Sequence, residues 1–150
     1  MSTEFDEKHA ILDEHRHVME VVARVDECLW NSAPRDKAWG TELARRVGSV
    51  VEQLKLHFSG NAERSMFEEL AHTAPHLIGK LRNLGAEHDQ ILTDFRRVAE
   101  MALEVDVTDS EAATRLAALA RKAIAKLRRH EAEENEIVLD AVLEDLGGGD

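Results

Sequence analysis

Three features of the 150-residue sequence predict an all-α protein, an up-down-up-down four-helix bundle. Apolar residues recur in alternating steps of three and four, the spacing of the buried face of an α-helix. Only two prolines occur, and three of the eight glycines stand together at the C-terminus, so long helices are rarely interrupted. The connections between the apolar segments are short, which favours antiparallel neighbours packed at crossing angles of roughly 20°.

Capping and turn-forming residues divide the chain into four predicted helices. Ser2 or Thr3 can cap the first helix, and Pro75 suits the first position of the third. The helices are expected at about residues 2–30, 36–70, 75–103 and 108–146, with a break at 31–34 after the first. The length suits a single core, so we expect one domain over residues 1–146 and a flexible tail at 147–150.

Composition excludes several classes of function. The formal net charge of −11 argues against a nucleic-acid partner, which requires basic patches. No apolar run approaches the roughly 20 residues of a membrane span, and no signal peptide is evident. Cys28 is the single cysteine and cannot form an internal disulfide, so a cytoplasmic location is expected. The oligomeric state stays open.

One histidine falls in the apolar seam of each predicted helix: His15, His57, His88 and His130. At 1.5 Å per residue, His15 and His57 lie roughly 24 and 31 Å from the connection that their helices share. The same estimate places His57 and His88, and then His88 and His130, at similar distances from their shared connections. Buried imidazoles need partners. Four of them facing one another at one height indicate a metal site, with a hydrogen-bond network as the alternative.

The two halves of the chain look like two copies of one helical hairpin. An offset of 73 residues maps the first two of these histidines onto the last two, and it maps Asn61 onto Glu134. Glu134 lies four residues after His130 on the same helix face, where a buried carboxylate is costly unless it is paired or metal-bound. We predict that Glu134 bridges two metal ions; pairing with Arg128 or with solvent is the alternative.

The first half lacks the matching carboxylate. Asn61 is a poor metal ligand and is expected only to form hydrogen bonds. Glu63 is the nearest carboxylate, but in a regular helix it points roughly 120° away from His57. Only a distortion near Gly60 would bring Glu63 into the site.

The remaining histidines lie outside the apolar seams of the predicted helices. Two Glu-x-x-His pairs occur, Glu14/His17 and Glu69/His72, but they lie at unequal heights and are read as chance. The histidines outside the seams are predicted to be solvent-exposed: His9, His17, His72 and His76. Imidazole combined with carboxylate suits iron, zinc, copper or nickel.

Taken together, these motifs resemble the hemerythrin-like (HHE cation-binding) family over essentially the whole chain. The resemblance is carried by His15, His57-Phe58, Glu87-His88 and His130-x-x-x-Glu134. It implies a non-haem di-iron centre in which the four histidines bind iron and Glu134 bridges. The sequence departs from oxygen-carrying members at Leu84, where they have a further histidine, and at Asn61. It is therefore similar to variants with fewer histidines.

The predicted metal-site residues are His15, His57, Glu63, His88, His130 and Glu134, with two non-haem iron ions as the expected cofactor. The resemblance implies a protein that binds or senses dioxygen or a related small oxidant. One alternative is a catalase-like, iron-dependent enzyme that removes peroxide or nitric oxide, although no catalytic acid or base can be named. A second alternative is a structural or zinc-binding bundle.

Overall fold

The computed structural model describes residues 3–31 and 34–147, which form five α-helices and a short 3-10 helix, with no strand in either range. Their bounds are α1 (Thr3–Trp30), α2 (Lys37–Ser59), α3 (Asn61–Thr73), η1 (Pro75–Leu77), α4 (Ile78–Glu104) and α5 (Ser110–Gly147). The all-helical class is thus confirmed. The predicted flexible tail falls mostly on residues 148–150, which lie outside the described ranges; Gly147 still belongs to α5. Within those ranges no helix combines the length and the apolar character that crossing a membrane requires.

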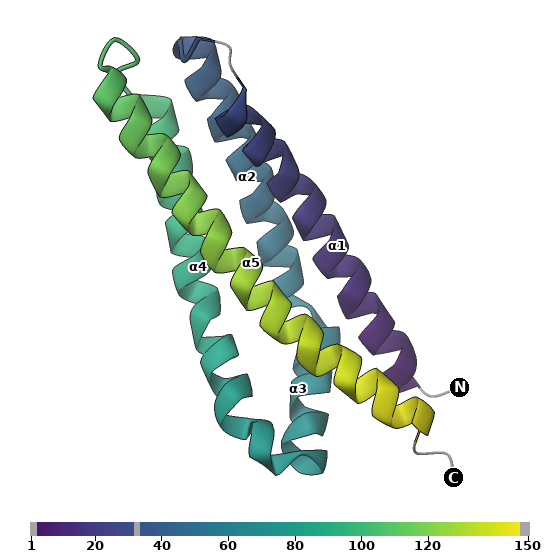
Figure 1. The fold of residues 1–150 in the computed structure, drawn as a ribbon. Helices are drawn as coiled ribbons and strands as arrows, with labels where there is room; N and C mark the ends of the chain where they lie inside the picture. Colours follow the sequence, from purple (N-terminus) through teal and green to yellow (C-terminus); the bar gives the residue numbers. More distant parts are fainter. Residues whose placement is uncertain (1–2, 32–33, 148–150) are drawn as a thin grey trace.

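The second predicted helix is divided in two at Gly60. Gly60 has an extended conformation, with φ −69° and ψ 147°, and its N–H donates to the carbonyl oxygen of His57. A glycine in a helix interior costs about 1 kcal/mol relative to alanine, which makes this the weak point of the segment. The expectation of one continuous helix to residue 70 was therefore wrong. In Figure 1, α3 continues beyond the end of α2.

The chain reverses direction between α1 and α2, between α3 and α4, and between α4 and α5 (Figure 1). Side chains that cap the helices help to fix these reversals. Asp36 accepts a hydrogen bond from the backbone N–H of Trp39 at 3.0 Å, and Asp109 accepts one from the N–H of Glu111 at 3.0 Å. As a result, α1 begins, and α5 ends, at the end of the molecule where α3 lies.

The buried apolar side chains form two separate clusters. The larger one joins α1, α2, α4 and α5, and includes Val22, Leu43 and Phe95. The smaller one joins α3 to the start of α1, the start of α4 and the end of α5, and includes Ile11 and Met66. Along α1 the buried stripe runs through Ile11 and Val18, whereas the neighbouring Leu12 and Met19 are only half-buried.

A polar layer separates the two apolar clusters. Along α1, His15 lies between Ile11 of the smaller cluster and Val18 of the larger one. The order is the same on α4, where His88 lies between Leu84 and Ile91. Because α1, α4 and α5 cross this layer and α2 ends in it, the fold brings polar side chains from distant parts of the sequence to one level.

Candidate metal centre

The four predicted histidines meet in the polar layer, each from a different helix. The Nε2 atoms of His15 and His57 are 3.1 Å apart, and the ring centroids of His88 and His130 are 5.1 Å apart. Three of the four rings are buried, whereas the side chain of His88 is 18% exposed and stacks on Phe58 at 3.9 Å. The α-helical period alone explains this convergence, because each histidine continues the apolar seam of its helix.

Glu134 occupies the middle of this layer and reaches both pairs of histidines. Its Oε2 lies 2.9 Å from Nε2 of His15, and its Oε1 lies 2.9 Å from Nε2 of His130. The Oε1 atom is also 3.5 Å from Nε2 of His88. The alternative partner of Glu134, Arg128, instead pairs with Asp26 on the surface. This position is the one that a bridging carboxylate requires.

Glu63 enters the site because the chain breaks at Gly60. The break restarts the helix, so that Glu63 lies in the first turn of α3 and is only 4% exposed. Its Oε2 is 2.9 Å from Nε2 of His57, and its Oε1 is 3.1 Å from Nε2 of His88. Asn61 is exposed, so its expected hydrogen-bonding role in the site was wrong. The reason is that α2 ends before Asn61 is reached.

A third carboxylate, Glu131, was missed by the sequence reasoning. It is 2% exposed, and its Oε2 lies 3.1 Å from Nε2 of His15. Glu131 directly follows His130 and precedes Glu134 by three residues, a spacing that places the two glutamates on neighbouring parts of one helix face. That spacing was the only available signal, and it also occurs on many solvated helix surfaces.

Three of the imidazoles are oriented by acceptors on their outer side. Glu14 lies 2.7 Å from Nδ1 of His57, Glu87 lies 2.7 Å from Nδ1 of His130, and Asn135 Oδ1 lies 2.5 Å from Nδ1 of His15. An Nδ1–H that donates outward leaves the Nε2 atom of a neutral ring free to accept a metal ion. Glu14 and Glu87 are related by the same 73-residue offset as the histidines. The internal repeat therefore includes two of the three groups that orient the rings, whereas Asn135 maps onto Ala62.

The electrostatics of the chamber are dominated by its carboxylates. Burial lowers the pKa of His57, but contacts with Glu134 and Glu63 outweigh burial and raise it to about 11. The same balance raises the pKa of His88 to about 9. Burial raises the pKa of Glu131, whereas for Glu134 the four imidazoles overcome burial and lower the pKa. The chamber thus favours positive charge, whether carried by protons or by a cation.

Several buried polar atoms in the chamber form no hydrogen bond of good geometry, although most of them lie 2.9–3.1 Å from an oppositely charged or titratable partner. They include both carboxylate oxygens of Glu63, both of Glu131, Oε2 of Glu134 and Nε2 of His130. Buried polar atoms are normally satisfied, and a charged one left unpaired is costly. Cations bound between these atoms would satisfy them, so the residues present fit a metal centre.

The donor atoms form two groups that share Glu134. The first contains His15, His57, Glu131 and Glu134, and the second contains His88, His130 and Glu134; within each group the donor atoms lie within 4.8 Å of one another. Glu63 contacts one histidine of each group. All six predicted residues are therefore brought together, and their role as ligands stays a prediction.

The other histidines lie outside the chamber. The Glu14/His17 pair does not act as a unit, because Glu14 contacts His57 and His17 contacts Glu20 instead. The four remaining histidines are exposed: His9, His17, His72 and His76.

Comparison with known families agrees with this geometry. Residues 7–142 match the family model described as the hemerythrin HHE cation-binding domain. The chain therefore belongs to the hemerythrin HHE cation-binding family. Searches of curated proteins and of solved structures gave no match.

Proposed function

We propose that this chain is a non-haem di-iron protein that binds or senses dioxygen or a related small oxidant. Its scaffold is an up-down-up-down four-helix bundle in which α2 and α3 together form the second member. The observation that carries the proposal is the convergence of three buried carboxylates, Glu63, Glu131 and Glu134, on the Nε2 atoms of four imidazoles. Hydrophobic packing does not account for this set, and bound cations would neutralise its carboxylates.

The number and type of donors support two iron ions. Four imidazoles and three carboxylates are more ligands than one ion uses, and the two groups share a central carboxylate. A structural zinc ion is usually held by four ligands in a closed tetrahedron, which this set exceeds. Bound iron would supply the change of oxidation state that such a ligand requires. The outer-side acceptors of the rings, Glu14 and Glu87, would hold the imidazoles in the tautomer that binds metal.

The surroundings of the centre restrict its ligand to a small molecule. Apolar clusters lie on both sides of the layer and exclude bulk water. His88 is the most exposed of the four imidazoles, and Phe58 is stacked on it. We propose that dioxygen, peroxide or nitric oxide reaches the centre past this side, in a cytoplasmic protein without a nucleic-acid or membrane partner.

Metal analysis combined with absorption spectroscopy tests the proposal. Protein purified from iron-supplemented cells should contain close to two iron ions per chain, and the Glu134→Ala variant should contain about half as much. Absorption bands should appear when the anaerobically reduced protein meets dioxygen and should disappear on deoxygenation. A chain that retains no iron, or that retains zinc in its place with chelator-insensitive stability, would contradict the proposal.

Glu131 favours a second candidate, the turnover of peroxide. A third buried carboxylate makes the donor set rich in anionic oxygen, and such ligands stabilise the higher oxidation state of iron. Gas evolution from added peroxide that His130→Ala abolishes would support an enzyme. Reversible oxygenation without gas evolution would support binding or sensing.

A further inference from the structure

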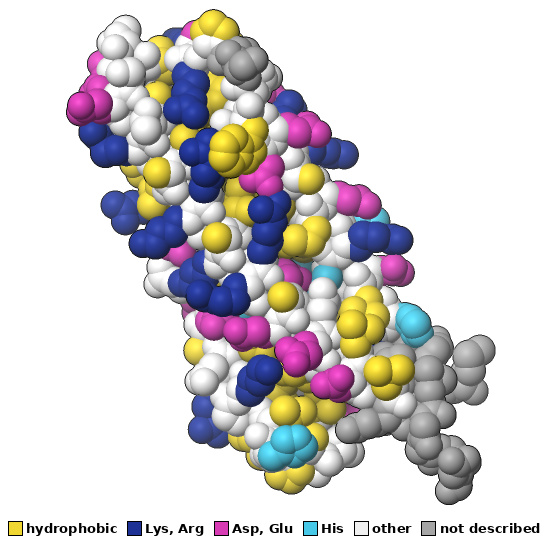
Figure 2. Space-filling view, in the orientation of Figure 1, with side chains coloured by type: hydrophobic (Ala, Val, Ile, Leu, Met, Phe, Trp, Pro, Cys, Tyr) yellow, Lys and Arg dark blue, Asp and Glu magenta, His cyan; other side chains and the backbone are white. Residues whose placement is uncertain are grey.

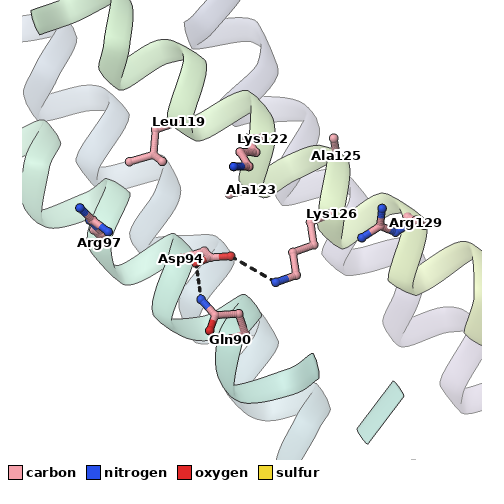
Figure 3. A pocket seen from close by; sticks show the side chains of 9 residues that line it. All are labelled: Gln90, Asp94, Arg97, Leu119, Lys122, Ala123, Ala125, Lys126 and Arg129. Atoms are coloured by element: carbon pink, nitrogen blue, oxygen red, sulfur yellow. Dashed lines mark hydrogen bonds and ion pairs between the residues drawn. The ribbon is translucent and has the colours of Figure 1, made fainter. Parts of the chain in front are cut away.

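A groove of about 490 Å³ lies outside the metal centre, along the seam between α4 and α5. Figure 3 shows four basic side chains around it, Arg97 from α4 and Lys122, Lys126 and Arg129 from α5. Asp94 is the single acidic residue of its lining. The groove therefore carries a net charge of +3, in a chain whose formal net charge is −11.

Three of these cations have no partner within the part of the chain that the structure describes. Lys126 lies 3.7 Å from Asp94, which also accepts a hydrogen bond from Gln90 at 2.8 Å. Arg97, Lys122 and Arg129 form neither an ion pair nor a hydrogen bond with any described residue, although exposed arginines elsewhere, such as Arg45, are paired. Figure 2 shows further Lys and Arg side chains along this face. Like charges brought together without partners repel one another, so a bound anion would stabilise the groove.

We infer that this groove binds a small phosphorylated anion with two or more negative charges. Guanidinium and ammonium groups are the usual recognition elements for phosphate, and arginine can bind it in a bidentate manner. The volume lies within the range of roughly 300–1,000 Å³ that is usual for small-molecule sites. A long polyanion is disfavoured, because the rest of the acidic surface would repel it.

The groove also has an apolar wall formed by Leu119 and Ala123. A nucleoside di- or triphosphate has both parts that this lining would recognise, since its phosphates carry charge and its base has a flat apolar face. Inorganic triphosphate has the charge alone. The two sources of phosphate can therefore be distinguished by their relative affinities.

Titration calorimetry on the full-length protein tests the inference, with inorganic triphosphate and ADP as probes. The Arg97→Gln/Lys122→Gln double variant should weaken binding at least about tenfold, since two charge-assisted contacts are lost. Arg96→Gln is the matched control, because Arg96 is the exposed neighbour of Arg97 on α4 and does not line the groove. It should change affinity less than about twofold, and raising the salt concentration should weaken binding to the parent protein.

Two results would overturn the inference. One is the absence of binding to the parent protein at millimolar probe. The other is binding that the double variant leaves unchanged, which would locate the anion at the metal centre or elsewhere on the surface. If ADP binds at least as tightly as triphosphate, which carries more charge, the apolar wall contributes and the ligand is a nucleotide; tighter binding of triphosphate assigns the site to the phosphates alone. Because the substituted side chains are exposed, the variants should retain the parent's thermal stability, which a melting curve checks.

Discussion

Replacing Glu131 with glutamine should affect the metal-free and metal-loaded protein differently. The carboxylate of Glu131 is 2% exposed; its Oε2 lies 3.1 Å from Nε2 of His15, and neither oxygen forms a hydrogen bond of good geometry. Without a cation, a buried charge in this position is costly. The nearly isosteric but neutral glutamine should therefore leave the metal-free protein at least as stable. With metal present, the same change removes an anionic ligand and should destabilise the loaded protein.

The size of the effect follows from linkage between binding and folding. Changes around metal ligands typically weaken metal affinity about 10–100-fold, and loss of a direct ligand should reach the upper value. A 100-fold loss corresponds to about 2.7 kcal/mol of metal-dependent stabilisation. At about 2–4 °C per kcal/mol for a domain of this size, the melting temperature with excess metal should fall by roughly 5–11 °C.

Anaerobic thermal unfolding, with excess ferrous iron or with chelator, measures both effects. The control is Glu133→Gln, which makes the same charge change two residues along α5 at a half-buried position outside the chamber. It should preserve the difference between the two melting temperatures. If Glu131→Gln lowers both melting temperatures equally, Glu131 has only a structural role. If the variant keeps the full difference, Glu131 is not a ligand.

Two further predictions concern the scaffold. A Cβ atom at Gly40 would lie 2.8 Å from the carbonyl oxygen of Ala102, so Gly40→Ala should lower the free energy of unfolding by about 1–2 kcal/mol. A Cβ atom at Gly48 would have nothing within 4 Å, so Gly48→Ala should raise the free energy of unfolding by up to about 1 kcal/mol. Urea unfolding measures both changes. Equal effects of the two substitutions would refute the close approach of α2 to α4. Asp36→Ala should cost about 1 kcal/mol, since the N–H of Trp39 loses its acceptor, and Asp36→Asn should cost much less. A similar loss in both variants would show that the cap does not matter.

The positions of the four histidines could be predicted because helix periodicity fixes the direction of a side chain. Leu54 and His57 are separated by one helical turn, so whichever side of α2 buries the leucine also buries the histidine. The same rule placed Glu134 beside His130. It held because the structure keeps these segments regular, and it would hold for any regular helix with the same spacing.

Helix periodicity alone does not predict that Glu63 and Glu131 enter the site, for different reasons. The direction of Glu63 depends on the backbone of Gly60, whose extended conformation lies outside helix periodicity. The direction of Glu131 follows from periodicity, but a glutamate at the edge of a helix face can be solvated or buried. Its burial is decided by the partner that lies opposite, His15, which is 116 positions away in the sequence. Local patterns do not contain such a pairing.

The 73-residue repeat also breaks at the point that matters for the centre. The offset maps Gly60 onto Glu133, where α5 continues without interruption, so the second half supplies its carboxylates from one helix. The first half supplies its carboxylate from α3, after the break. The repeat thus retains the imidazoles and the acceptors Glu14 and Glu87, whereas the carboxylates that face the centre come from α5 and from α3.

This asymmetry makes the centre a property of the whole bundle. The donor group that contains the histidines of α1 and α2 takes both of its carboxylates, Glu131 and Glu134, from α5. Neither helical hairpin alone therefore supplies all the donors of that group. Metal binding should consequently fix α5 against α1 and α2, between the two apolar clusters. The rise in melting temperature on adding metal measures this docking. Substitution of a single carboxylate on α5 should therefore reduce that rise.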